Sequence, residues 1–192
     1  MRSTHLMPIA MLAFAAACSD TTTSPTSVDR PTFLVTAGSY AGTLNTSNTP
    51  GGGHLQSGSI NCVVGSDLSI TCSSGAYQIN GIGHTNATAT LVSSYSATVD
   101  CTNKGGNLVE VKSTAQSAPV SSGPIPSSKN GSLVVQPIST SGPSTATLLA
   151  AATCPNGNWT KTLAGGTVTL ESFTYTLTFA GFSFPAVSIS AS

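Results

Sequence analysis

The chain has 192 residues, of which only 6% are charged, and its formal net charge is zero, whereas about 25% of residues are charged in an average soluble protein. This length fits one domain with a real hydrophobic core and leaves little room for two. The chain has no cluster of lysine and arginine, so we expect no nucleic acid partner. Low charge also weakens the repulsion between copies, which favours self-association.

The first residues have the organisation of an export signal, which we assign to residues 1–17. A positive start precedes the apolar run Leu6–Ala17, which is too short for a membrane span. The residues Ala15-Ala16-Ala17-Cys18 resemble the lipobox of bacterial lipoproteins. The resemblance implies that the leader is removed and that Cys18 is diacylated and held in a membrane, although the family prefers leucine at the position of Ala15.

Ala15 and Ala17 also fit a plain secretory cleavage site, so secretion without lipid is the alternative. By the sorting habit of the lipoprotein family, Ser19 after the cysteine implies the outer membrane or the cell surface. The following residues are polar and rich in Thr, Ser and Pro. We therefore assign residues 18–31 to the lipidated cysteine and a flexible tether, and residues 32–192 to a single folded domain.

The first predicted strands are Thr32–Thr36 and Tyr40–Leu44, followed by a Gly-rich loop at Asn45–Gly58. The stretch Ser59–Cys72 has the pattern of a hairpin, with turn residues at Gly65-Ser66-Asp67. Next come a short strand at Tyr77–Ile79 and a turn region up to His84.

Four cysteines remain beside Cys18, and an even number in an exported chain indicates two disulfides. In the predicted hairpin, Cys62 and Cys72 lie on one face, directly opposite each other if the loop is Ser66–Leu68 and diagonal if it is shifted by one residue. We predict the pair Cys62–Cys72, which leaves Cys101 with Cys154.

The longest alternating pattern is Asn86–Cys101, in which most odd-numbered residues are apolar and most even-numbered residues are polar. At about 3.3 Å per residue this strand would exceed 50 Å, well above the usual length, so we expect a bend or break near Ser93-Ser94. Cys101 would end the strand on its apolar face.

The rest of the chain also favours short strands. We predict strands at Leu108–Lys112 and Leu133–Ile138, and an irregular segment between them at Ser113–Lys129 because of its prolines. Asn130-Gly131 is a hairpin signal, and we assign the ambiguous run Thr145–Thr153 to a buried strand. The apolar parity changes at Glu171-Ser172, which predicts a bulge, and a last strand is expected near the C-terminus.

About ten short strands and two disulfides fit an all-β fold, an antiparallel β-sandwich of the immunoglobulin-like kind, with a partly closed barrel as the alternative. The segments Cys101–Asn107, Lys129–Gly131 and Cys154–Trp159 are together similar to secreted bacterial β-proteins of unknown function. This resemblance implies a fold and no activity.

The sequence predicts no catalytic residue, no metal site and no cofactor. His54 and His84 lie in Gly-rich stretches without a nucleophile or zinc-ligand motif beside them. The acids Asp67, Asp100, Glu110 and Glu171 are scattered. Among the aromatic residues, Tyr40 and Tyr77 lie beside loops, whereas Trp159 is close enough to Cys154 in the sequence for its ring to pack on a disulfide. We therefore take Tyr40, Tyr77, His54 and His84 as the candidate ligand contacts.

These observations favour a non-enzymatic, lipid-anchored envelope protein with a structural, adhesive or partner-binding role. In addition to the membrane, we then expect the protein to contact a second copy of itself or a partner in the cell envelope. A carbohydrate-binding surface module is the alternative, and a hydrolase using a histidine with a distant carboxylate is the third hypothesis.

Overall fold

The computed structural model describes residues 34–166 and 168–192, which belong to one compact unit, Phe33–Ser192. The predicted signal peptide, Cys18 and the tether lie outside the described residues and stay predictions. In the described part the chain is nearly all β, with one short α-helix and one 3-10 turn at Thr46–Asn48. No helix found there is long and apolar enough to cross a membrane.

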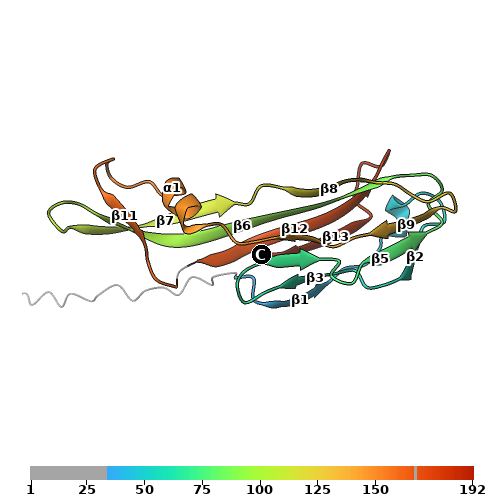
Figure 1. The fold of residues 1–192 in the computed structure, drawn as a ribbon, viewed down its shortest axis with the longest axis horizontal. Helices are drawn as coiled ribbons and strands as arrows, with labels where there is room; N and C mark the ends of the chain where they lie inside the picture. The colour runs from blue at the N-terminus through green and yellow to red at the C-terminus, as the bar shows by residue number, and fades with distance from the viewer. Residues whose placement is uncertain (1–33, 167) are drawn as a thin grey trace, which may run out of the picture. The chain divides into compact units, whose positions relative to one another are not determined.

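The larger sheet is built around one central strand, β6 (Ala87–Thr102), to which four strands pair directly (Figure 1). These four are β12 (Thr169–Phe179), β11 (Thr160–Leu163), β7 (Leu108–Gln116) and β8 (Val120–Ile125). Strand β13 (Val187–Ala191) continues the sheet beyond β12. All of these pairings are antiparallel.

Two smaller antiparallel sheets share a core with one face of the larger sheet. The first has the order β1 (Gly38–Ala41), β3 (Asn61–Val64), β4 (Ile70–Cys72), β10 (Ile138–Thr140). The second has the order β2 (His54–Ser57), β5 (Tyr77–Asn80), β9 (Ser132–Val135). The sheets do not close into a barrel. The prediction of an antiparallel β-sandwich with two disulfides is therefore confirmed.

The alternation along β6 explains how the sheet is buried. Its odd-numbered residues are all buried, whereas most even-numbered ones are only partly covered. Over the first half of the strand the buried side chains, such as Leu91 and Tyr95, join the large core between the layers. Over the second half Ala97 joins a small core with Ala115 and Leu148. One strand thus supports two cores of very different size.

Leu148 belongs to helix α1 (Thr145–Ala151), where a strand was predicted, so this assignment was wrong. Ser144 caps the helix, its Oγ accepting a hydrogen bond from Thr147 N at 3.2 Å. Alanine and leucine have high helix propensity, and seven residues suffice because the helix is stabilised by packing on β7 and β6. The sequence pattern could not separate a short buried helix from a buried strand.

The chain does not break near Ser93-Ser94, because β6 continues through these residues. At this point β6 changes its partner strand along one edge. Leu91 pairs with Val120 of β8, and Ser94 pairs with Gln116 of β7. Ser117 N donates to Ser93 O at 2.8 Å, which ends the β7 ladder there. The strand is long because two shorter partners follow each other along one of its edges.

Several boundaries also differ from the prediction. Strand β7 extends to Gln116, and β8 and β2 lie in segments that were predicted as loops. The predicted strand Leu133–Ile138 is divided into β9 and β10, with Pro137 between them. The described residues of the predicted strand Thr32–Thr36 are not in a strand. The bulge is confirmed, since the register of β12 against β6 shifts between Leu170 and Ser172.

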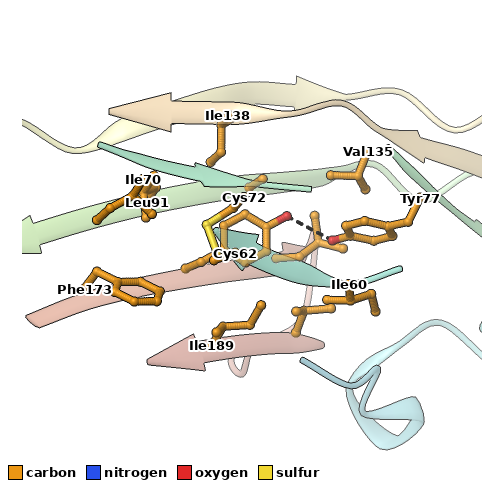
Figure 2. Packing of buried hydrophobic residues seen from close by; sticks show 14 of the residues in the cluster. Ile60, Cys62, Ile70, Cys72, Tyr77, Leu91, Val135, Ile138, Phe173 and Ile189 are labelled. Atoms are coloured by element: carbon orange, nitrogen blue, oxygen red, sulfur yellow. Dashed lines mark hydrogen bonds between the residues drawn. A yellow bond between two sulfur atoms is a disulfide. The ribbon is translucent and has the colours of Figure 1, made fainter. Parts of the chain in front are cut away.

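The predicted disulfide hairpin is formed by β3 and β4. Cys62 lies directly opposite Cys72, and Gly65 N donates to Ser69 O at 2.8 Å, which leaves the loop Ser66–Leu68. Leu68 takes a left-handed conformation with φ of 64°, a region that favours glycine. The disulfide between these cysteines is fully buried and forms part of the large core (Figure 2).

Candidate functional site

The four predicted ligand contacts do not form one site. Tyr77 is only 1% exposed, so its predicted surface position is wrong. Tyr40 is half-buried, packs edge-on against Phe173 and donates its hydroxyl to Thr36 O at 2.8 Å. His54 is exposed on β2, with its Nδ1 2.9 Å from Gly52 O, and His84 is exposed in the turn after β5.

Tyr77 is buried because its hydroxyl has partners inside the core. Its Oη lies 3.0 Å from the Oη of Tyr175, which in turn lies 3.1 Å from Ser73 Oγ (Figure 2 shows the first of these hydrogen bonds). Burial raises the pKa of both phenols, so they remain neutral and exchange hydrogen bonds as donors and acceptors. Strand parity alone could not show that a tyrosine beside a loop has a buried partner from β12.

Both predicted disulfides are present. Cys62–Cys72 joins neighbouring strands, whereas Cys101–Cys154 joins the end of β6 to the segment after α1 and closes a sequence separation of 53 residues. The second bridge therefore holds together two loops that are distant in sequence, the turn Asn103–Asn107 and the loop Asn156–Trp159. Cys18, the predicted lipidation site, lies outside the described residues.

The half-buried side chain of Trp159 lies between two hollows, and we call this region the Trp159 tip. The first hollow, of about 290 Å³, is lined by Trp159 together with Asn103, Lys104, Gly105, Asn156 and Asn158. The second, of about 200 Å³, is lined by Trp159 together with Ala152, Thr153, Cys154, Asn156, Gly157 and Lys161. Both are at or below the small end of ligand sites in proteins, which suits a single small ring rather than a large ligand.

Hydrogen bonds fix the backbone of the Trp159 tip. Asn103 Oδ1 accepts from the backbone N of Gly105 and of Asn107, both at 2.9 Å. Asn156 Oδ1 accepts from Asn158 N at 3.1 Å. With these carbonyl oxygens engaged in the turns, the amide NH2 groups remain as side-chain donors for a ligand, together with the ammonium group of Lys104.

Lys161 also supports the Trp159 tip from behind. Its Nζ donates to Leu149 O at 3.0 Å and to Ala152 O at 2.6 Å, near the C-terminal end of α1. A cation is favourable there because the last carbonyls of a helix lack backbone partners. Lys161 therefore acts as a structural residue that ties β11 to the helix.

The acids are less scattered than the sequence predicted, because Asp100 lies opposite Glu110 and Glu171 pairs with Lys112. The pKa of Asp67 is lowered by hydrogen bonds from the hydroxyl and the backbone N–H of Ser69, which places this carboxylate in the β3–β4 turn. Residues 34–166 and 168–192 contain no group of three or more His, Cys, Asp or Glu that could hold a metal ion.

Glu171 and Lys112 form an ion pair of 2.6 Å. The hydrogen bond from Lys112 lowers the pKa of Glu171. A carboxyl whose folded-state pKa is lowered stabilises the fold above its unfolded pKa, and this contribution is lost as the pH falls through the folded value. Because the Lys112 side chain is 66% exposed, we expect a contribution of at most about 1 kcal/mol.

The corresponding prediction compares the wild type with Glu171→Gln. At pH 7 the variant should unfold at a lower urea concentration than the wild type, and the two midpoints should converge as the pH is lowered below the pKa of Glu171. Urea unfolding followed by circular dichroism at both pH values measures this. A midpoint difference that persists in acid would show that the carboxylate charge is not its cause.

Comparisons with known proteins give no relatives: no family model, no curated protein and no solved structure matches this chain. The assignment of the Trp159 tip as a candidate site therefore rests on its geometry alone. Sequence reasoning had named Trp159 as a ring packed near a disulfide. The flanking Asn-Gly-Asn segment, which favours an exposed turn, was the signal that the ring also borders the surface.

Proposed function

We propose that this protein is exported and anchored by lipid at Cys18, and that it has a structural, adhesive or partner-binding role without catalysis at the outer membrane or cell surface. The lipobox-like residues Ala15–Cys18 support the anchor. The two disulfides support an oxidising compartment, because such bonds are rare in reducing ones. The residues 18–31 would then space the domain from the membrane.

The Trp159 tip is the observation that carries the binding role. An aromatic ring that is only half-buried offers a large contact area at low entropic cost, and aromatic rings are frequent anchors of protein interfaces. The Cys101–Cys154 bridge and the turn hydrogen bonds order this region before any partner arrives. Such pre-organisation lowers the entropic cost of binding.

Carbohydrate binding is the second candidate, and the chemistry of the same tip favours it. A sugar ring presents an apolar face, which an indole can cover, and hydroxyl groups, which amide NH2 groups can bind. Asn103, Asn156 and Asn158 line the first hollow beside the ring. Lys104 is the one charged side chain that lines the first hollow, and the formal net charge of the chain is zero, so neutral glycans are the first ligands to test.

The anchor is tested by intact mass spectrometry of protein extracted from membranes of its native host, with and without reduction. We expect the mass of residues 18–192 with added acyl chains, and a gain of four hydrogens on reduction because two disulfides are present. An unmodified Cys18, or free thiols on the other four cysteines before reduction, would contradict the proposal.

The binding role is tested through the fluorescence of Trp159, which is the only tryptophan in the chain. Titration with neutral cell-wall polysaccharides should shift the emission, and Trp159→Ala should weaken adhesion to those polymers at least tenfold. The matched control is Phe184→Ala, because Phe184 is 70% exposed and lies outside the tip. Equal losses in both variants would indicate nonspecific apolar adhesion, and adhesion unchanged by Trp159→Ala would remove the tip from the binding role.

A further inference from the structure

Strand β7 is an edge strand of the larger sheet. It pairs with β6 over nine residues, from Leu108 to Gln116, and in the part of the chain that the structure describes no strand pairs with its other edge. Unpaired strand edges of this kind present rows of N–H and C=O groups that can accept another strand.

The register shows which residues carry the free backbone groups. In an antiparallel pair, opposite residues alternate between those that exchange hydrogen bonds and those that do not. Asn103 N donates to Asn107 O, and Ser117 N donates to Ser93 O, so the odd-numbered residues of β7 bond to β6. The backbone groups of the even-numbered residues, among them Glu110 and Lys112, therefore point to the free edge.

Other features distinguish β7 from its neighbour β8. Strand β8 includes Pro124 and Gly123, the latter with φ of 65°, and Pro126 follows it directly. Proline and an irregular backbone protect an edge from pairing. Strand β7 has no proline, and it exposes Leu108 by 55% and Val109 by 40%.

The charges of β7 are complementary to a second copy in one register. In an antiparallel pair centred on Val111, Glu110 of each copy lies opposite Lys112 of the other. A pair centred on residue 110 or 112 would instead place like charges opposite each other, which is destabilising. The register centred on Val111 also places even-numbered residues of one β7 opposite even-numbered residues of the other. This is required because the even-numbered residues carry the backbone groups that point to the free edge.

Glu110 also has no ion-pair partner among residues 34–166 and 168–192. It lies opposite Asp100 of β6, another carboxylate, and Asp100 Oδ1 is buried without a hydrogen-bond partner among the described residues. Lys112 of a second copy would bring a positive charge beside both carboxylates. The ion pair of Lys112 with Glu171 leaves the Lys112 side chain 66% exposed, so its ammonium group remains accessible to a neighbouring chain.

We propose that the β7 edge pairs antiparallel with the β7 edge of a second copy, centred on Val111, and joins two larger sheets into one. This pairing deepens the proposed structural role, and rests on it for the local concentration that a membrane anchor supplies. A single strand pair buries less area than a stable interface usually does, so the dimer should be weak in dilute solution.

The test uses the mature chain in detergent and two single variants, Glu110→Lys and Lys112→Glu. In the first, lysine faces lysine in the homodimer, and in the second, glutamate faces glutamate, so each should raise the dimer dissociation constant at least tenfold. In a mixture of the two variants, both cross-strand pairs have opposite charges. Sedimentation velocity should therefore show a dimer again, with a dissociation constant within a few-fold of the wild-type value.

The control is Lys129→Glu, which makes the same charge change at an exposed position between β8 and β9 and should leave the dimer unchanged. Thermal unfolding of each variant reports whether it is folded, and Thr114→Pro, which removes an outward N–H, should block pairing by a separate route. A wild-type chain that stays monomeric at the highest concentration, or a mixture that does not recover, would overturn the proposal. Since the dimer is measured apart from the mass of Cys18, failure of either proposal is recognised on its own.

Discussion

Replacing Cys101 and Cys154 together with alanine should lower the free energy of unfolding by about 4 kcal/mol, because the bridge closes a long loop in the unfolded chain. The two cysteines are 53 residues apart. For a domain of this size the melting temperature should fall by roughly 8–16 °C. The emission of Trp159 should also shift, because its loop is no longer held to the end of β6.

The matched control is the double replacement of Cys62 and Cys72, whose separation is only 10 residues. Loop entropy gives this bridge about 3 kcal/mol, and Trp159 emission should not change. Calorimetry and chemical denaturation of both double variants measure the two effects. A Cys101/Cys154 variant that unfolds within 1 kcal/mol of the wild type would show that the loop is ordered by other contacts.

Tyr175→Ala should be the most damaging single substitution in the large core, with a loss of about 3–5 kcal/mol. The side chain is fully buried, so its removal leaves a cavity between the layers. It also removes the hydrogen-bond partner of Tyr77 and of Ser73. A buried hydroxyl without a partner costs about 1–3 kcal/mol.

Tyr175→Phe separates the two causes, because it keeps the ring and removes only the hydroxyl. It should cost about 1–3 kcal/mol. The control Tyr40→Phe should cost less than about 0.5 kcal/mol, since its hydroxyl bonds an exposed carbonyl only four residues away. Equal stability of Tyr175→Phe and the wild type would mean that Tyr77 and Ser73 do not depend on this hydroxyl.

Features that depend on neighbouring residues were predictable from the sequence. The alternation of β6 predicted its buried face, and the turn residues between β3 and β4 predicted a hairpin with Cys62 and Cys72 on one face. Two registers were left open, and the structure has the one in which these cysteines lie directly opposite each other. The change of parity near Glu171 gave the bulge. Each of these rests on local chemistry with a period of two residues, which a sequence shows directly.

Features that depend on distant partners were not predictable in this way. The burial of Tyr77 depends on its hydrogen bond with Tyr175, which lies 98 residues later in the chain. The unbroken course of β6 depends on two successive partners, β8 and β7, and the helical state of Thr145–Ala151 depends on the β7 surface that it covers.

The candidate site was predictable only in its parts. The pair Cys101–Cys154 was predicted because four cysteines remain beside Cys18 and the hairpin pattern pairs Cys62 with Cys72. Trp159 was predicted to lie near this disulfide because it follows Cys154 closely in the sequence. That this ring borders two hollows depends on how the turn Asn103–Asn107 comes to lie beside it. The Asn-Gly-Asn segment indicates an exposed turn, but the set of residues that line each hollow is a property of the assembled surface.

The unequal cores on β6 imply an order of failure under tension. Among the described residues, the small core holds Ala97, Ala115 and Leu148, with Leu163 and Val168 packed against it, so it should unfold at a lower force than the large core. A pull on Trp159 would then unravel β11, whereas the helix would be shielded, because it lies beyond Cys154 and the Cys101–Cys154 bond passes the load to β6. In a force-extension experiment, this step would appear as a short and reversible increase in length before the sandwich unfolds. Reduction of the Cys101–Cys154 bond would make the increase longer.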